Sequence, residues 1–121
     1  MSDRRQQLGR RGEELAAKHL VDAGQEILRR NWRCPAGEVD IVTQDGDTLV
    51  LVEVRARSGR RYGKPEESIT ARKRATLLNC GRYLVADLEW DGPWRIDVVA
   101  VEMGPTGIPQ RITVIPNAVE A

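Results

Sequence analysis

A β-hairpin in the middle of the chain is the clearest structural signal in the sequence. The turn sequence Asp45-Gly46-Asp47 separates two runs rich in β-branched and aliphatic residues, 38–43 and 48–57. An Asp-Gly pair between two such runs is a strong signal for a tight turn joining antiparallel strands. The alternation gives the pair one apolar face, formed by Val39, Ile41, Val50, Val52 and Val54.

The segments around this hairpin predict two helices and three further strands. Helical spacing of apolar residues marks residues 2–23 and 66–86, and strand-like runs occupy residues 26–33, 94–103 and 111–115. Gly24 ends the first helix, and Pro65 suits the first turn of the second. The order predicts a mixed α/β fold in which the first three strands form a meander and the second helix crosses over to a further strand. At 121 residues, we expect a single domain over residues 1–121.

Charge is distributed unevenly along the chain. Residues 34–54 carry five acidic and no basic side chains, whereas residues 55–82 carry nine basic and two acidic ones. A solvated surface is one interpretation of such runs. The other is an acidic metal-binding centre flanked by bases that hold phosphates. Charge alone does not choose between them.

The composition excludes several classes of protein. Two cysteines, Cys34 and Cys80, and one histidine are too few for a disulfide framework or a four-ligand zinc site, and the cysteines lack the spacing of a redox motif. No apolar run approaches the ~20 residues of a membrane span, and residues 1–12 are too polar for a secretory signal. We therefore expect a soluble cytoplasmic protein with no membrane partner.

Two acidic residues, Asp40 and Glu53, stand on the two strands of the hairpin. A loop with an even number of residues places both on one face of the sheet, opposite or diagonal, whereas a three-residue loop separates them. The apolar alternation favours the even loop. Because two carboxylates on an apolar sheet repel each other and lose hydration, they need compensation. Either Arg55 or Arg57 neutralises them in a buried salt bridge, or they bind a divalent ion of the Mg²⁺ type.

Several short motifs stand in a specific order along the chain. They are Gly12-Glu13, Asn31-Trp32-Arg33, Gly37-Glu38-Val39-Asp40, Val52-Glu53-Val54-Arg55, Lys73 and Arg95-Ile96-Asp97-Val98. Their order and spacing resemble the UPF0102 (YraN-like) family, small bacterial proteins of the restriction-endonuclease-like PD-(D/E)xK superfamily that are similar to archaeal Holliday-junction resolvases. The resemblance covers about residues 8–101. It implies a restriction-endonuclease-like core, here about residues 8–103.

The resemblance implies a metal centre. By position, Asp40 and Glu53 would be metal ligands, with the backbone carbonyl of Val54 as a third. Glu13 in the first helix would match an additional carboxylate of the resolvase-like branch, the alternative being an exposed helix residue. The implied cofactor is Mg²⁺ or Mn²⁺, as one or two divalent ions.

Arg55 occupies the position of the motif's lysine, which orients or deprotonates the attacking water. Arginine has a pKa above about 12 and cannot act as a base, but it can orient water or stabilise charge that develops on a phosphate. Lys73, on the second predicted helix, is a candidate to replace that lysine. The alternatives for Lys73 are a plain phosphate contact or a solvated helix residue.

A dense group of basic residues follows the acidic pair. Its members are predicted to contact nucleic-acid phosphates: Arg57, Arg60, Arg61, Lys64, Arg72 and Arg74. Tyr62 between them can stack on a base. We assign Trp32 to packing and Asp97 to structural hydrogen bonding.

Three functional classes follow from these observations. The first is a metal-dependent endonuclease that hydrolyses phosphodiester bonds in structured or branched nucleic acid, with DNA ahead of RNA as substrate. The second, supported by Arg55, is a non-catalytic nucleic-acid-binding module on a nuclease fold. The third is an interaction protein with no nucleic-acid partner. The resemblance to resolvases also suggests a homodimer, since a junction needs two symmetric cuts.

Overall fold

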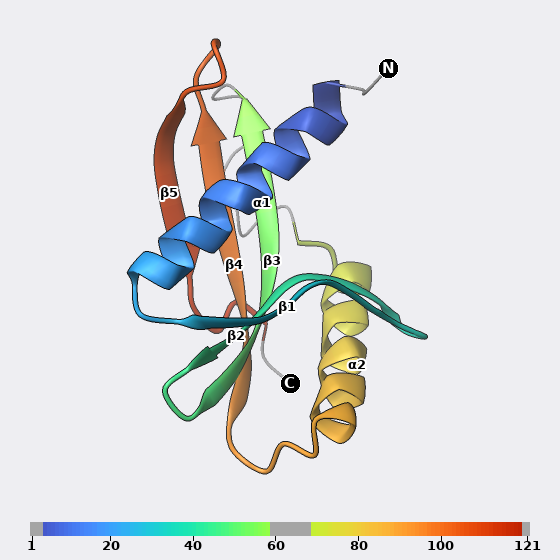
Figure 1. The fold of residues 1–121 in the computed structure, drawn as a ribbon. Helices are drawn as coiled ribbons and strands as arrows, with labels where there is room; N and C mark the ends of the chain where they lie inside the picture. Colours follow the sequence, from blue (N-terminus) through green and yellow to red (C-terminus); the bar gives the residue numbers. More distant parts are fainter. Residues whose placement is uncertain (1–3, 59–68, 120–121) are drawn as a thin grey trace.

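The computed structural model describes residues 4–58 and 69–119. Its elements, in chain order, are α1 (Arg4–Asp22), β1 (Glu26–Cys34), β2 (Gly37–Asp45), β3 (Thr48–Ser58), α2 (Ala71–Asp87), β4 (Trp94–Met103) and β5 (Pro109–Ile115) (Figure 1). The predicted order of helix, three strands, helix and two strands is confirmed. No helix within the described ranges is long and apolar enough to cross a membrane.

The strands form one mixed sheet in the order β1-β2-β3-β4-β5. Strands β3 and β4 pair in parallel, and the remaining neighbours pair antiparallel. Parallel neighbours need a crossover connection, and α2 lies within the one that joins β3 to β4. The predicted meander and crossover are therefore confirmed.

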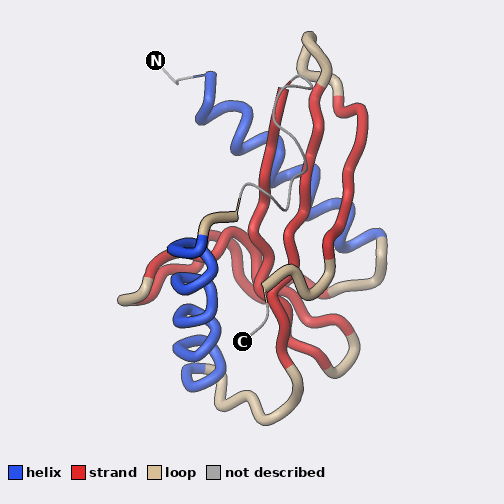
Figure 2. The backbone as a smooth tube through the Cα atoms, turned by 180° about the vertical axis from the view of Figure 1, so that it is seen from behind, coloured by secondary structure: helices blue, strands red, loops and turns tan. Residues whose placement is uncertain are grey.

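The two helices pack on opposite faces of the sheet, as the views from the front and from behind show (Figures 1 and 2). The α1 cluster consists of Ala16, Ala17, Leu20, Ile41, Val50, Val52, Val99, Val101 and Met103. The α2 cluster consists of Val39, Val42, Leu49, Leu51, Leu77, Cys80, Leu84, Ile96 and Val119. The alternation of β3 between these clusters follows its side-chain period of two.

The start of the second helix differs from the prediction. The helix begins at Ala71, and Thr70 is its N-cap: the Thr70 backbone is extended, and its side chain accepts a hydrogen bond from the Lys73 backbone N–H. Ile69, predicted as a helical position, precedes the cap. A threonine hydroxyl at this position satisfies a backbone N–H that the first turn leaves unpaired, which defines the start of a helix. The predicted start at Pro65 and residue 66 lies outside the described residues.

The predicted apolar face of the hairpin is wrong at one position. Ile41 packs in the α1 cluster as expected, but Val39, two residues earlier on the same strand, packs in the α2 cluster. The ladder between β2 and β3 runs only from Asp45 to Ile41, which pairs with Val52. Beyond Ile41, β2 departs from β3 toward α2, and this departure carries Val39 to the other cluster.

Candidate active site

The hairpin turn determines how the two acidic residues are aligned. Asp45 pairs with Thr48, so the loop consists of two residues, Gly46 and Asp47. Gly46 has a φ of 62°, a left-handed conformation that glycine adopts without steric cost. The expectation of an even loop is confirmed. Extending this register by one step places Asp40 opposite Glu53.

Asp40 lies at the point where β2 separates from β3. If the ladder continued, Val39 would be the partner of Val54; instead the Val54 backbone N–H donates to Asp40 Oδ2 at 2.8 Å. The N–H and C=O groups of one strand residue point to the same side of the strand. The Val54 carbonyl therefore faces the same side as the Asp40 carboxylate, where the resemblance implies a metal ligand.

Glu53 is buried in the sheet between two basic side chains. Its side chain is 7% exposed, with Lys73 Nζ at 3.4 Å from Oε2 and Arg55 Nε at 3.9 Å from Oε1. Both Glu53 Oε2 and Arg55 Nε are buried and make no hydrogen bond within the described part of the chain. The charges of Lys73 and Arg55 thus neutralise Glu53 at a distance, and Glu53 Oε2 accepts no hydrogen bond from the described residues.

Both carboxylates resist ionisation in this setting. Burial raises the pKa of Asp40, the charge of Glu13 adds to the effect, and the hydrogen bond from Val54 opposes it. Burial also raises the pKa of Glu53, as does the charge of Asp40, and the positive charge of Lys73 offsets part of the increase. A cation between the two carboxylates would relieve their repulsion and favour their ionised forms.

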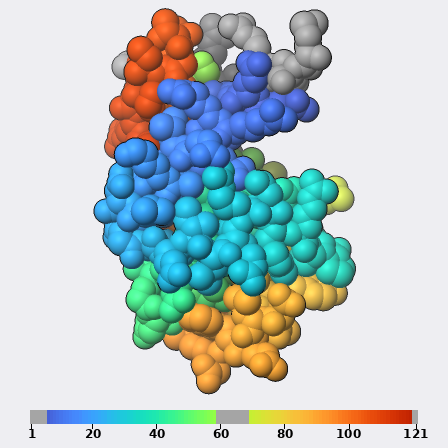
Figure 3. Space-filling view, in the orientation of Figure 1, coloured from blue at the N-terminus to red at the C-terminus, as the bar shows by residue number. Residues whose placement is uncertain are grey.

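Glu13 approaches the site from α1. A Cβ atom at Gly12 would lie 2.5 Å from the Ala56 Cβ atom, so only glycine lets the helix come this close to β3. The Glu13 side chain is 14% exposed, which contradicts the alternative of an exposed helix residue. The surface is hollowed between α1 and the β1–β2 hairpin, the elements that carry Glu13 and Asp40 (Figure 3).

Two residues of β1, Arg30 and Asn31, hold the Glu13 carboxylate, a role that was not predicted from the sequence. Arg30 donates to Glu13 Oε1 at 3.1 Å, and the Asn31 side-chain amide donates to the same oxygen at 3.0 Å. Asn31 has a φ of 50°, in the left-handed region. Asparagine is depleted in strands and tolerates this conformation better than most residues. An asparagine within a strand-like run was the signal that could have identified this position.

The structure brings Lys73 to the acidic pair and leaves its neighbours at the surface. Lys73 is half-buried on the side of α2 that faces the sheet, whereas Arg72 and Arg74 are exposed. Arg57 is half-buried at the end of β3. The other predicted phosphate contacts, Arg60, Arg61 and Lys64, lie outside the described residues, as does Tyr62.

Asp97 has the structural role that the sequence predicted. It is fully buried in β4 and accepts hydrogen bonds from Arg95 Nε at 3.0 Å and from the Asn117 backbone N–H at 2.8 Å. Arg95 also donates to Asp45 Oδ2 at 2.9 Å, which joins β4 to the hairpin turn. Trp32 packs against the α2 cluster, as expected.

The donor set of the site is small. Among the residues that the structure describes, no group of three His, Cys, Asp or Glu side chains converges in a way that could hold a metal ion. Asp40 and Glu53, with the Val54 carbonyl on the same side, remain as candidate ligands. Ions of the Mg²⁺ type bind through one or two carboxylates and keep several waters, so this set fits such an ion.

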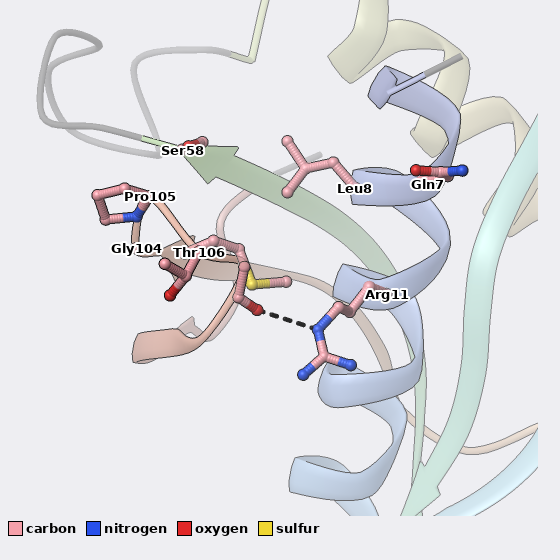
Figure 4. A pocket seen from close by; sticks show the side chains of 9 residues that line it. Gln7, Leu8, Arg11, Ser58, Gly104, Pro105 and Thr106 are labelled. Carbon is pink, nitrogen blue, oxygen red and sulfur yellow. Dashed lines mark hydrogen bonds between the residues drawn. The ribbon is translucent and has the colours of Figure 1, made fainter. Parts of the chain in front are cut away.

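A second concavity lies away from these residues, between α1 and the loop that joins β4 to β5 (Figure 4). It measures about 800 Å³, and Arg11 Nε on one wall donates to the Gly107 carbonyl on the other at 3.1 Å. It contains none of the candidate catalytic residues. We therefore place the candidate active site at the strand separation.

The sheet, with a helix on each face and a carboxylate pair where two strands part, defines an α/β protein with a restriction-endonuclease-like core. The family model described as "Uncharacterised protein family UPF0102" matches residues 12–101, and the chain belongs to this family. The resemblance to the UPF0102 family inferred from the motifs is thus confirmed.

Relatives with the same family name align with almost the whole length of this chain. A "UPF0102 protein" of Roseiflexus castenholzii is 48% identical, over 99% of this chain and 98% of that protein. Another, from Pelotomaculum thermopropionicum, is 46% identical, over 98% of this chain and 99% of its own length. A third, from Clavibacter michiganensis, is 45% identical, over 95% and 98%.

Proposed function

We propose that this protein is a metal-dependent endonuclease that hydrolyses phosphodiester bonds in structured or branched nucleic acid, with DNA ahead of RNA as substrate. The observation that carries the proposal is the geometry at the strand separation: Asp40 is held by the Val54 N–H next to Glu53, and Lys73 Nζ and Arg55 Nε lie beside the Glu53 carboxylate. The restriction-endonuclease-like fold supports the assignment by analogy.

The residues at the strand separation suit a divalent ion. Asp40, Glu53 and the Val54 carbonyl would hold Mg²⁺ or Mn²⁺; Glu53 Oε2 makes no hydrogen bond in the described part of the chain, and the Lys73 ammonium group, 3.4 Å away, would have to give way to an ion at this oxygen. When bound, such an ion polarises a phosphate oxygen and lowers the pKa of a bound water. The Val54 N–H holds Asp40 Oδ2 at 2.8 Å and so keeps this carboxylate at the strand separation.

The two basic side chains have different tasks in this proposal. Arg55 keeps its proton and stabilises negative charge that develops on the phosphate. Lys73 orients the attacking water from the α2 side of the sheet. Its ammonium group lies 3.4 Å from Glu53 Oε2 without a hydrogen bond at that oxygen, and a divalent ion at Glu53 would take over the neutralisation of this carboxylate and leave Lys73 available to the water.

Basic residues around Lys73 supply the contacts to the nucleic-acid backbone. Arg72 and Arg74 are exposed on either side of Lys73, at the first turn of α2. Each phosphate that such a side chain neutralises releases counterions, which makes binding depend on salt. We assign these residues to substrate binding and Lys73 to the reaction.

Cleavage of labelled substrates tests the proposal. The panel contains single strand, duplex, flap, four-way junction and RNA, each with Mg²⁺, Mn²⁺ or a chelator. A Glu53→Ala variant, purified in parallel, excludes a contaminating nuclease, and Glu26→Ala changes an exposed carboxylate of β1 as a matched control. We expect metal-dependent cutting by the parent and by Glu26→Ala but not by Glu53→Ala. Equal cutting by all three preparations contradicts the proposal.

One observation favours a second candidate function, a nucleic-acid-binding module without catalysis. The motif's lysine is replaced by Arg55, and Lys73 Nζ already lies where a cation would neutralise Glu53. A module of this kind would bind junctions or duplex in a salt-dependent way and cut none of them. Its signature is unchanged binding by the Glu53→Ala variant together with no cleavage by the parent.

A further inference from the structure

Two cysteines that are distant in the sequence meet at one end of the molecule. Cys34 ends β1 and Cys80 lies within α2, 46 positions further along, yet their sulfur atoms are 3.6 Å apart. Both are free thiols. Their positions in the sequence show no redox spacing, because the pair forms only through tertiary structure. The proposed function uses neither residue.

The hairpin end and α2 are held close together around this pair. A Cβ atom at Gly37, where β2 begins, would lie 2.7 Å from the Thr76 side chain and 3.6 Å from Cys80 Sγ. Its φ of 151° also disfavours other residues. Glycine therefore lets the β1–β2 end lie directly against α2, as Figure 1 shows. The sulfur atoms meet across a tight contact between two elements.

The two sulfur atoms differ in access to solvent. Cys34 is half-buried and lines an open pocket of about 480 Å³, together with Trp32 and Tyr83. Cys80 is fully buried, and burial, reinforced by the neighbouring Cys34 sulfur, raises the pKa of its thiol to about 12. Because the thiolate is the reactive form of cysteine, a small oxidant meets Cys34 first.

We propose that Cys34 and Cys80 form a reversible disulfide when the protein meets a peroxide. The Cys34 thiolate attacks a peroxide oxygen; an S–O bond forms, the O–O bond breaks, and hydroxide leaves to become water. The Cys80 sulfur then attacks the Cys34 sulfenic sulfur; the S–S bond forms, the S–O bond breaks, and a second water leaves with the Cys80 proton. Two thiols lose two electrons in total, and the peroxide gains them.

The disulfide would act on the elements that build the candidate site. Cys80 and Lys73 lie two turns apart on the same side of α2, and Lys73 reaches Glu53. Cys34 lies in the hairpin that also carries Asp40. The bond would therefore tie α2 to the end of β1, next to the turn into β2, the strand that departs from β3 at Asp40. The proposal itself rests on the sulfur pair and does not depend on the proposed function.

Intact mass and thiol counting after treatment of the whole protein with hydrogen peroxide test this proposal. We expect the parent to lose the mass of two hydrogen atoms and both free thiols, to yield a peptide linking Cys34 to Cys80, and to recover with dithiothreitol. In a Cys80→Ala variant, dimedone should trap a sulfenic acid at Cys34. In a Cys34→Ser variant, the buried Cys80 should stay reduced.

Three results would overturn the proposal. They are two free thiols in the parent after peroxide treatment, a crosslink only between two molecules, and oxidation of Cys34→Ser as fast as the parent. Circular dichroism checks the fold of each variant. If Cys80→Ala does not fold, the parent and the Cys34→Ser variant, which changes a half-buried thiol to a similar hydroxyl, decide the question. None of these measurements uses nuclease activity.

Discussion

The backbone N–H of Val54 donates to Asp40 Oδ2 at 2.8 Å, at the position where Val39 would otherwise pair with Val54. Strand β2 leaves the ladder here, and the carboxylate replaces a backbone acceptor. The contact therefore has two roles. It satisfies a strand N–H that the separation would leave unpaired, and it holds a negative charge beside Glu53, where a cation would be attracted.

Two substitutions at Asp40 separate these roles. In Asp40→Asn the side-chain oxygen still accepts from Val54 and the charge is gone, so we expect a stability at least equal to the parent's and weaker divalent-ion binding. Asp40→Ala leaves the Val54 N–H unpaired and should destabilise the fold by about 1 kcal/mol or more. Urea denaturation without metal measures both. Equal destabilisation by the two variants would show that the hydrogen bond is unimportant.

The acidic pair should make stability depend on pH. The folded-state pKa values of Asp40 and Glu53 are raised above their ordinary 3.8 and 4.5. Between the unfolded and folded pKa values, the native state binds more protons than the unfolded state, so the free energy of unfolding falls as pH rises. The contribution of the pair is fully present below the unfolded values and is lost as pH rises through the folded ones.

A Glu53→Gln variant tests this dependence, since glutamine does not titrate. The free energy of unfolding, measured in metal-free urea from acidic to neutral pH, should fall less for Glu53→Gln than for the parent in that window. The exposed Glu26→Gln change is the matched control and should follow the parent. If the parent and Glu53→Gln have parallel pH profiles, the pKa of Glu53 is not raised.

Local patterns were enough to predict that the acidic pair shares one face of the sheet. Side chains alternate with a period of two along a strand, and an Asp-Gly turn favours a loop with an even number of residues. The loop Gly46-Asp47, seen in the structure, decides between the opposite and the diagonal placement. The separation of β2 from β3 was not predictable in this way. It goes together with the close approach of Gly37 to Thr76 on α2, and periodicity within one strand carries no information about such a contact.

Contacts with distant segments were also unpredictable from the sequence at two other positions of the candidate site. Glu13 was a candidate ligand, but the residues that hold it, Arg30 and Asn31, belong to another element. Lys73 was proposed because helices pack near the sheet face, and the structure supplied its contact with Glu53. In each case the residue type was visible in the sequence, and the partner required the fold.

Asn31 is predicted to act as a positioning residue for Glu13. In Asn31→Gly the left-handed backbone stays favourable and only the amide that holds Glu13 Oε1 is lost. Glu13 is not among the candidate ligands, but its charge acts on Asp40, which is one. We expect unchanged stability and about a tenfold loss of metal affinity or activity, the size seen when groups behind the ligands are removed. Rescue by raised Mn²⁺ distinguishes positioning from a structural role. Unchanged metal affinity would remove Asn31 from the site.

Lys73 should matter more than the bases beside it. The positive charge of Lys73 lowers the pKa of Glu53, so Lys73→Ala should raise that pKa further. We also expect this variant to lose about a hundredfold in activity. Arg72→Ala and Arg74→Ala change exposed neighbours; each should mainly weaken binding and lower its salt slope by about one. Equal losses in all three variants would make Lys73 an ordinary phosphate contact.

The Arg55→Lys variant tests whether arginine in place of the motif's lysine has abolished catalysis. Arg55 Nε is buried without a hydrogen bond in the described part of the chain, and its ion pair with Glu53 Oε1 is long, at 3.9 Å. A lysine there loses no hydrogen bond of this nitrogen and keeps the positive charge. If Lys73 already serves the reaction, Arg55→Lys alone should leave cleavage within about threefold of the parent. The Lys73→Ala variant should lose activity, and adding Arg55→Lys to it should restore that activity. If the parent binds but does not cut and Arg55→Lys cuts with Mg²⁺, the metal site is intact and the lost lysine was the missing group. No cleavage by any of these variants, with junction binding retained, would favour the non-catalytic module.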